Sequence, residues 1–426
     1  MTRRLAPACV LGLVVLLCAG AVFASPASGA PAASAGASRG HESLGTVEER
    51  QAVSATGVGA LATGTLLTGK VSLYPRAIRL RHSGAANGRI IASVVTFTER
   101  GGEGAILESV DDGRTFQQVG SIPAAQQAGT QGLCCASIYE LPTQVGDLPA
   151  GTLLWAGSVG QDAGSDRRMT QRVWRSHDLG RTWTYLSTCA ASPNARGMWE
   201  PELSVDRYGR LVCHFADETE GPEGSQRLAR TVSTDGVTWS PVHETVASRP
   251  GLGRPGMPIV RRLPDGSYVM VYEICAAPGQ YDCALYLRRS ADGWDWGDPS
   301  DPGSMLVAAS GRYFTHTPNL AVVPRSDGGA RLVLVGQLLQ DPDGSIAAGN
   351  GATLMVNERD GYGPWREVPA PVAVPGAYNN YCPNYSSTLV PSTDGRSILE
   401  IATDYAEDGV CKAYYATGRL PGPTSR

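Results

Sequence analysis

The sequence predicts an all-β fold, a six-bladed β-propeller with four antiparallel strands in each blade. Three observations support this prediction. One short segment recurs four times along the chain, a longer strand–turn–strand pattern recurs six times, and no stretch of the body has the apolar period of a long amphipathic helix. The composition agrees, because 52 Gly and 29 Pro with only 18% charged residues suit many short strands joined by turns.

The short repeat begins with Ser, has Asp two residues later and then Gly, and ends with Phe or Trp. Its copies occupy residues 109–116, 176–183, 233–239 and 290–296, and we interpret residues 357–365 as a degenerate fifth copy. Asp accepts a hydrogen bond from the backbone two residues on, and Gly adopts positive φ without strain. Each copy should therefore form a hairpin corner between two outer strands, with its Asp holding a turn rather than catalysing a reaction.

The longer pattern is a strand, a turn and a second apolar strand. Its copies cover residues 74–93, 134–157, 199–216, 255–273, 315–337 and 381–403. Six copies of roughly 60 residues predict six blades around one axis in a single domain, residues 71–420. In such a fold, the starts of the innermost strands and the ends of the strands that follow them meet at one mouth of the central channel. Polar residues at these positions are therefore candidates for a functional site.

The N-terminal part of the chain, before Val71, is expected to lie outside the propeller. Arg3 and Arg4 precede an apolar stretch that runs to Phe23, which is typical of a secretion signal peptide, residues 1–24. Pro26 bounds the apolar run, so a permanent membrane span is not expected. Residues 25–70 are rich in Ala, Gly, Ser and Thr, which predicts a flexible tether. The mature protein is thus predicted to be secreted, free of the membrane and monomeric.

Cysteine usage agrees with export. Two of the 10 cysteines lie in the predicted signal peptide, and the even number that remains implies disulfides. Cys275 and Cys283 are expected to pair across a short loop, and Cys382 with Cys411 is the next expected pair. The others would then pair among themselves: Cys134, Cys135, Cys189 and Cys213. A zinc site is the competing interpretation, but no two cysteines have C-x-x-C spacing, so neither a metal nor a cofactor is predicted.

Two carboxylates stand out among the residues at the predicted mouth. Glu200 begins an innermost strand, and Glu273 ends the second strand of the next blade, so adjacent blades could point both at the axis. Two carboxyl groups about 5–5.5 Å apart are what retaining glycoside hydrolysis needs, one as nucleophile and the other as acid and then base. The alternative is structural: both glutamates could hold blades together by pairing with Arg76 and Arg254.

The remaining candidates are expected to contact a sugar substrate. Trp199, Tyr272 and Tyr381 could offer aromatic faces for stacking on sugar rings. The polar and charged candidates are Arg76, Asp217, Arg254 and His316, although His316 could equally be a packing residue. The partner is thus predicted to be an oligo- or polysaccharide. A nucleic-acid partner is not expected, because the formal net charge is -4 and the 36 basic residues are scattered.

Several segments resemble a known family. The short repeats are similar to the Asp boxes of sialidase-type propellers. Within that superfamily, residues 199–203, 215–218, 254–258 and 271–273 resemble glycoside hydrolase family 93. The members of this family are six-bladed propellers that release arabinobiose from the ends of linear α-1,5-L-arabinan with retention. The resemblance implies that Glu200 and Glu273 are the catalytic pair, with Glu200 favoured over Glu273 as the nucleophile, and that Tyr381 or a neighbour is an active-site tyrosine of the last blade.

Two other functions remain open on the same scaffold. A sialidase would need three arginines for the sialate carboxylate, but residues 74–76 match its first-arginine motif only loosely and no arginine lies in residues 378–385. A non-catalytic carbohydrate-binding propeller is the second alternative. The sequence also departs from the family pattern at Cys134-Cys135 and at the Cys275–Cys283 loop beside Glu273, and both could reshape the substrate pocket. A separation of the two carboxyl groups well beyond about 9.5 Å would exclude hydrolysis by the pair.

Overall fold

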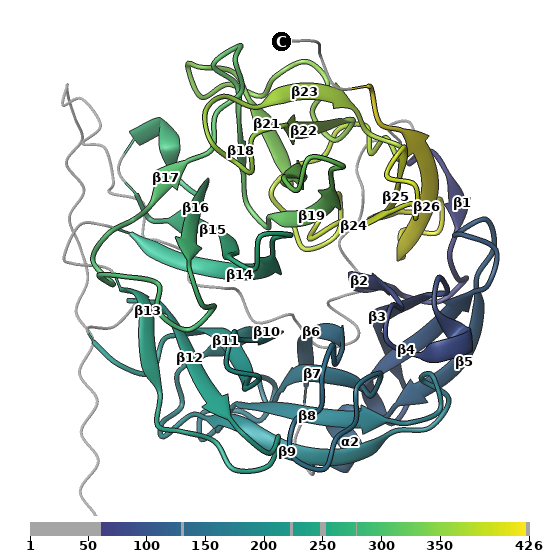
Figure 1. Cartoon of the computed structure of the whole chain (residues 1–426), viewed down its shortest axis with the longest axis vertical. Coiled ribbons are helices and arrows are strands. Elements are labelled where there is room, and N and C mark those ends of the chain that lie inside the picture. Colours follow the sequence, from purple (N-terminus) through teal and green to yellow (C-terminus); the bar gives the residue numbers. More distant parts are fainter. Residues whose placement is uncertain (1–60, 129–131, 222–224, 248–252, 278, 423–426) are drawn as a thin grey trace, which may run out of the picture. The chain divides into compact units, whose positions relative to one another are not determined.

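The computed structural model describes residues 61–422, except for 129–131, 222–224, 248–252 and 278. These residues form six antiparallel sheets around a central axis, with almost no helix, so the predicted six-bladed β-propeller is confirmed (Figure 1). The predicted signal peptide and most of the predicted tether lie outside the described residues. None of the described helices is long and apolar enough to cross a membrane.

Blades one to three each contain four strands, which follow the chain from the axis outwards. Blade one consists of β2 (Leu73–Arg79), β3 (Ile90–Thr98), β4 (Gly101–Ser109) and β5 (Gln117–Ile122). Blade two consists of β6 (Leu133–Glu140), β7 (Leu153–Val159), β8 (Thr170–Ser176) and β9 (Thr184–Ala191). Blade three consists of β10 (Met198–Val205), β11 (Leu211–Asp217), β12 (Arg227–Ser233) and β13 (His243–Ala247). The short helices η1 (Gly84–Ala86) and α2 (Ala124–Gln127) lie in connections of this half.

Blades four to six are less regular. Blade four consists of β14 (Arg254–Arg262), β15 (Tyr268–Cys275), β16 (Ala284–Ser290) and β17 (Ser304–Met305), and its sheet is extended by β18 (Tyr313–Thr315) and β21 (Leu338–Gln340). A 3-10 turn, η2 (Gly279–Tyr281), precedes β16. Blade five consists of β19 (Asn319–Pro324), β20 (Ala330–Val335), β22 (Thr353–Asn357) and β23 (Arg366–Pro369). Blade six consists of β24 (Thr388–Pro391), β25 (Ser397–Tyr405), β26 (Cys411–Arg419) and β1 (Thr65–Leu66).

The ring is closed by the N-terminal strand. Thr65 of β1 pairs with Tyr415 of β26, so the outermost strand of the last blade comes from the start of the described chain. The propeller therefore begins before residue 71, the boundary expected from composition. The two-residue strand carries no apolar alternation of its own, which is why the sequence pattern did not separate it from the tether.

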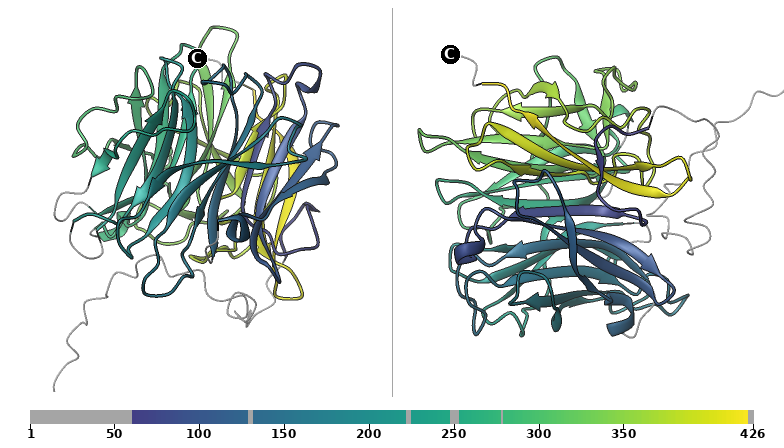
Figure 2. Two further views of the ribbon diagram at one scale, coloured as in Figure 1. Left: turned by 90° about the horizontal axis from the view of Figure 1, so that it is seen from below. Right: turned by 90° about the vertical axis from the view of Figure 1, so that its right-hand side faces the viewer.

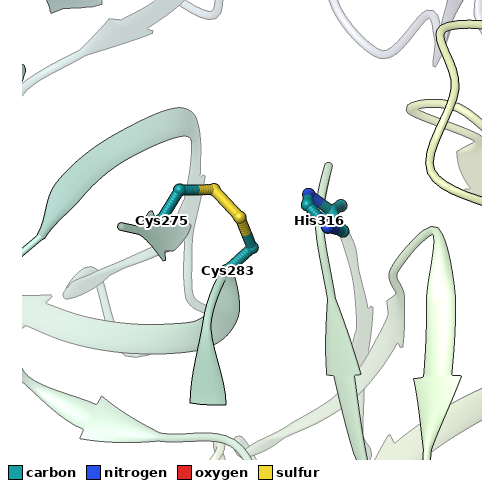
Figure 3. Close-up of side chains that lie close together, drawn as sticks. All are labelled: Cys275, Cys283 and His316. Carbon is teal, nitrogen blue, oxygen red and sulfur yellow. A yellow bond between two sulfur atoms is a disulfide. The ribbon is translucent and has the colours of Figure 1, made fainter. Parts of the chain in front are cut away.

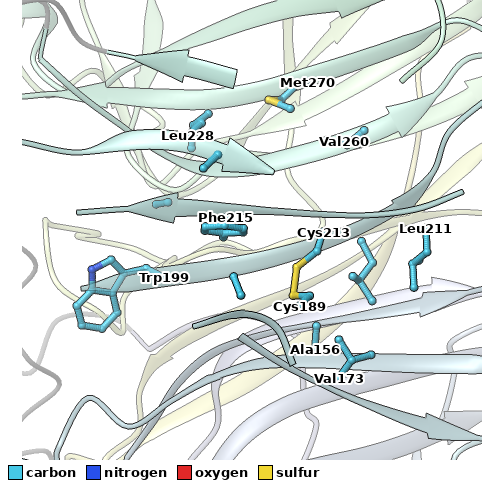
Figure 4. Packing of buried hydrophobic residues seen from close by; sticks show 14 of the residues in the cluster. Ala156, Val173, Cys189, Trp199, Leu211, Cys213, Phe215, Leu228, Val260 and Met270 are labelled. Atoms are coloured by element: carbon cyan, nitrogen blue, oxygen red, sulfur yellow. A yellow bond between two sulfur atoms is a disulfide. The ribbon is translucent and has the colours of Figure 1, made fainter. Parts of the chain in front are cut away.

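Packing between blades explains why the inner strands are apolar on both faces. Each blade is covered by a neighbour on either side, so every residue of β7, β10 and β11 is buried. Figure 4 shows one such contact, where Phe215 and Leu211 of blade three pack between Val173 of blade two and Met270 of blade four. In the side views of Figure 2, neighbouring sheets stand next to one another around the axis. Burial on both faces gives the near-continuous apolar runs that the sequence shows.

The short Ser–Asp repeats form the outer corners of the blades. In blade two, the Asp178 carboxylate accepts hydrogen bonds from the Thr182 backbone N–H at 2.9 Å and the Ser176 hydroxyl at 2.7 Å. The Ser176 hydroxyl oxygen in turn accepts the Gly180 N–H at 3.0 Å. Such bonds stabilise the ionised carboxylate and lower the pKa of the corresponding Asp235 to about 2. These aspartates hold turns between the third and fourth strands, away from the axis.

All eight cysteines within the described residues form disulfides. Cys275–Cys283 and Cys382–Cys411 pair as predicted. The remaining four also pair among themselves, as expected, in the form of Cys189–Cys213 and the adjacent Cys134–Cys135. Cys189 lies on β9 and Cys213 on β11, so their disulfide connects blades two and three within the core shown in Figure 4.

Candidate active site

The innermost strands share a two-residue bulge near their beginning. In blades one to four the pairing with the second strand skips two residues, between Leu73 and Arg76, Leu133 and Ala136, Trp199 and Glu202, and Gly256 and Ile259. A bulge bends its strand and re-aims a side chain, and bulges are common beside active sites. In four blades, the bulge therefore directs the side chain at this position differently from the side chains of the rest of the strand.

In five blades the first residue at this point is buried and has positive φ. These residues are Tyr74, Glu200, Met257, Thr317 and Ser386, with φ between 44° and 58° and exposed fractions of 4% or less. Positive φ is uncommon for residues other than Gly, and such conformations cluster at functional sites. In blades four, five and six this position lies after Arg254, His316 and Tyr381, which the sequence pattern placed at the mouth.

The two predicted carboxylates bind to the backbone of the next blade at this same position. Oε2 of Glu200, from blade three, accepts a hydrogen bond from the Met257 N–H of blade four at 3.3 Å. Oε2 of Glu273, from the second strand of blade four, accepts one from the Thr317 N–H before blade five at 2.6 Å. Both carboxylates are buried, with exposed fractions of 2% and 4%. The bulge of blade three thus carries the Glu200 carboxylate. The backbone N–H groups of Met257 and Thr317 orient both carboxylates.

Gly256 lies close to both carboxylates, and its position gives an upper bound on the distance between them. A Cβ atom added at Gly256 would lie 3.5 Å from Oε1 of Glu273 and 3.9 Å from Oε2 of Glu200. The distance between these two oxygens therefore cannot exceed the sum of those two distances. Carboxyl groups that cleave glycosidic bonds lie about 5–5.5 Å apart in retaining enzymes and about 6.5–9.5 Å apart in inverting ones. The pair is close enough for glycoside hydrolysis.

A tyrosine of the last blade lies close to both carboxylates. Burial, together with the negative charges of Glu200 and Glu273, holds the pKa of Tyr385 well above its usual value of 10. Its ring lies 6.3 Å, centre to centre, from that of Tyr74, whose hydroxyl donates to Sδ of Met257 at 3.7 Å. Because Tyr385 stays neutral, its hydroxyl can act as a hydrogen-bond donor near the two carboxylates. The sequence indicated Tyr381 or a neighbour, and the residue beside the pair is Tyr385.

Arg76 and Arg254 have other described partners than the two glutamates. The guanidinium of Arg76 lies 4.1 Å from the Tyr74 ring centre and donates to the Ser386 carbonyl at 3.0 Å, so it connects blade one to blade six. Arg254 forms an ion pair with Glu218 and donates to Oε1 of Gln226 at 2.9 Å. The contacts described for Arg254 thus connect blade four to blade three.

Asp217 and Glu202 also form ion pairs. Asp217 accepts two hydrogen bonds from the Arg227 guanidinium, at 3.0 and 2.9 Å, and one from the Thr219 N–H. Glu202, two residues after Glu200, pairs with Arg261. The described contacts of these two carboxylates hold blade three together and connect it to blade four.

Of the other aromatic candidates, Trp199 and Tyr272 lie in the core, and Tyr381 is half-buried. Trp199 is 3% exposed and lies in the packed region between blades, as labelled in Figure 4. Tyr272 is fully buried and its hydroxyl donates to the Pro302 carbonyl at 2.6 Å. Tyr381 forms a hydrogen bond with Tyr405 in blade six. Strand neighbours point to opposite faces, so Tyr272 is directed away from the side on which Glu273 lies.

His316 lies beside the Cys275–Cys283 disulfide (Figure 3). Its backbone N–H donates to the Cys283 carbonyl at 2.9 Å, and the next residue, Thr317, donates to Glu273. Ligand atoms of His316 and both cysteines lie within 4.8 Å of one another, the closest approach to a metal-binding cluster among the described residues. Since the two sulfurs are bonded to each other, they are not thiolate ligands. The disulfide and His316 instead form a covalently constrained part of the structure next to Glu273.

A six-bladed propeller with two carboxylates close together at its axis fits the class of propeller glycoside hydrolases. No protein-family model and no curated protein sequence matches the chain. Several solved structures, however, are similar to this chain. An α-L-arabinanase of Penicillium chrysogenum complexed with arabinobiose has 26% identity and a TM-score of 0.67, covering 84% of this chain and 98% of that one.

Two further similar structures come from Fusarium graminearum. The α-L-arabinofuranosidase ARB93A with an iminosugar inhibitor has a TM-score of 0.68 and 22% identity, covering 84% of this chain and 97% of that one. A family 93 α-L-arabinofuranosidase with arabinobiose has a TM-score of 0.67 and 22% identity over the same shares. The resemblance to glycoside hydrolase family 93 that the sequence indicated is confirmed, and it supports a glycoside hydrolase.

Proposed function

We propose that this protein is a secreted, retaining exo-glycoside hydrolase that releases arabinobiose from the ends of linear α-1,5-L-arabinan. The observation that carries the proposal is the placement of Glu200 and Glu273 around Gly256, where an added Cβ would lie 3.9 Å from the first carboxylate and 3.5 Å from the second. The substrate is suggested by similar proteins, an arabinanase and an arabinofuranosidase whose structures hold arabinobiose.

Each glutamate has one role in the proposed two-step reaction. In the first step an oxygen of Glu200 attacks the anomeric carbon while Glu273 gives its proton to the glycosidic oxygen, so that the shortened chain leaves. In the second step Glu273 takes a proton from water, and the resulting hydroxide attacks the anomeric carbon and releases Glu200. Two inversions give net retention.

The surrounding residues would position the pair rather than react. The Met257 N–H holds one oxygen of Glu200, and the Thr317 N–H holds one oxygen of Glu273. The neutral Tyr385 hydroxyl is suited to donate to the carboxylate that is charged in a given step. Fixed donors of this kind need no rearrangement as charge moves between the two steps.

The test is hydrolysis of linear α-1,5-arabinan, with products separated by chromatography and the first-formed anomer identified by NMR. Arabinobiose should be the main product, and its α-anomer should appear first. Glu200→Gln and Glu273→Gln should each lower the rate by more than about a thousandfold without changing thermal stability greatly. Glu108→Gln is the matched control, because this buried carboxylate pairs with Arg89 and Arg181 away from the axis.

The same experiment separates the alternatives. Turnover of a sialoside in place of arabinan would favour a sialidase, and binding without turnover of any polysaccharide in a panel would favour a non-catalytic carbohydrate-binding propeller. First appearance of the β-anomer would replace retention by inversion, which the spacing of the two carboxylates around Gly256 also accommodates. Sequencing the N-terminus of the exported protein would test the proposed removal of residues 1–24.

A further inference from the structure

Blade two differs from the other five at the axial bulge. The position that Tyr74, Glu200 or Met257 occupies elsewhere is held here by Cys134 and Cys135, which are joined by a disulfide. Neither cysteine has positive φ, whereas the first bulge residue of the other blades does. In blade two, a disulfide between adjacent residues therefore occupies the position that a residue with positive φ has in the other five blades.

This disulfide does not cross-link distant parts of the chain. The partners of Cys189–Cys213 and Cys382–Cys411 are 24 and 29 residues apart, so each closes a long loop. Cys134 and Cys135 are adjacent, with a sequence separation of 1. Because a disulfide restricts the unfolded chain more as the loop grows longer, a bond between neighbours contributes little to stability in this way. Its effect is local: it fixes the shape of the bulge.

The disulfide lies among residues of the candidate active site. Cys135 is 2% exposed and belongs to the same buried cluster as Tyr74 and Met257. Cys134 is half-buried and packs against this cluster, as does Tyr385. It also packs against the cluster that contains Trp199, so the disulfide lies between the bulges of blades one and three. Cys134 is half-buried and therefore more exposed than Glu200 and Glu273, whose exposed fractions are 2% and 4%.

We propose that the Cys134–Cys135 disulfide is a substrate contact, an apolar surface against which the C–H face of an arabinofuranose ring packs beside Glu200. This inference rests on the proposed function and adds a residue pair that determines its specificity. Two bonded sulfurs are polarisable and donate no hydrogen bond, whereas free thiols or hydroxyls would be rotatable donors. A ring that is already fixed loses little conformational entropy when the sugar binds.

The test compares two double variants on linear arabinotriose, each checked by mass spectrometry for the missing disulfide. Cys134→Ala with Cys135→Ala should raise KM by about tenfold, which corresponds to about 1.4 kcal/mol, with kcat within about twofold and little change in Tm. The control, Cys189→Ala with Cys213→Ala, should lower Tm while leaving KM unchanged, because it removes a long loop closure in the core between blades.

A second measurement covers the case in which the first variant does not fold. Mild reduction of the wild-type protein should raise KM, and reoxidation should restore it, while Cys134→Ser with Cys135→Ser should not respond. An unchanged KM after loss of the bond, or a KM that changes only together with Tm as in a structural role, would overturn the inference. Inactivity of the wild type on all arabinan fragments would instead refute the proposed function, and this inference with it.

Discussion

The outer corners and the axial bulges are both repeated features, but they repeat in opposite ways. At the corners the side chains are the same in each copy, Ser, Asp, Gly and an aromatic residue, because each copy performs the same task of holding a turn. At the bulges the backbone has the same positive φ in five of the six blades, and the side chain differs, from Tyr and Glu to Met, Thr and Ser. Constant side chains mark the scaffold, and varied side chains on a constant backbone mark the site.

The largest expected effect concerns the side chain that the blade-three bulge presents. Moving the carboxylate one methylene back, Glu200→Asp, should reduce kcat by more than about a hundredfold, since a displacement of about 1 Å is costly in a positioned site. The matched change at a corner, Asp178→Glu, should leave kcat unchanged. Steady-state kinetics on arabinan fragments, with Tm measured in parallel, compares the two regions directly. Equal kcat values for the two variants would contradict the distinction.

The next effect tests the space between the carboxylates. In Gly256→Ala, the new Cβ would lie 2.7 Å from Nε2 of Gln226 and close to both carboxylates. We expect kcat to fall by about tenfold or more while the protein still folds, because the Gln226 side chain can move. Gly209→Ala is a stability control, since nothing lies near a Cβ at this turn although its φ of 76° favours Gly. We expect Gly209→Ala to lower Tm with normal kcat, in contrast to Gly256→Ala, which lowers kcat.

Much of the fold could be predicted because its signals are local. The corner repeats and the strand–turn–strand spacing each lie within a few residues, and they sufficed to count six blades. The pair Glu200 and Glu273 followed from blade spacing. Tyr385 was covered only as a neighbour of Tyr381, because blade six has Ser386-Ser387 where four blades have a residue followed by Pro, and that X-Pro signal is what aligns the bulges. Trp199 and Tyr272 looked like stacking residues because burial on both faces hides which side of a strand is axial.

A smaller effect is expected for Tyr385→Phe, which removes the hydroxyl near both carboxylates. We expect kcat to fall by about tenfold with KM nearly unchanged, because the hydroxyl positions groups that react. Since the pKa of Tyr385 is held well above 10, the wild-type rate should show no fall from its ionisation up to pH 10. A wild-type pH profile with an alkaline limb near pH 10 that Tyr385→Phe abolishes would contradict this assignment.

The smallest effect concerns the corners, whose aspartates act on stability. The pKa values of Asp111 and Asp235 are lowered to about 2 by hydrogen bonds. A depressed folded-state pKa gives stability that is present above the unfolded value, near 3.8, and is lost as the pH falls towards 2. Tm should therefore drop between pH 4 and pH 2. Asp235→Asn should lower Tm at pH 7 by about 2 °C and weaken this acid dependence, without altering kcat.

The most direct measurement of the central claim is rescue by azide of alanine variants acting on an aryl α-arabinobioside with a good leaving group. If Glu200 is the nucleophile, azide replaces it in Glu200→Ala and the product is the inverted β-glycosyl azide. If Glu273 is the acid/base, azide attacks the glycosyl-enzyme in Glu273→Ala and the product is the retained α-glycosyl azide. The opposite assignment of anomers would reverse the two roles, and no azide product from either variant would contradict a paired-carboxylate site at the axis.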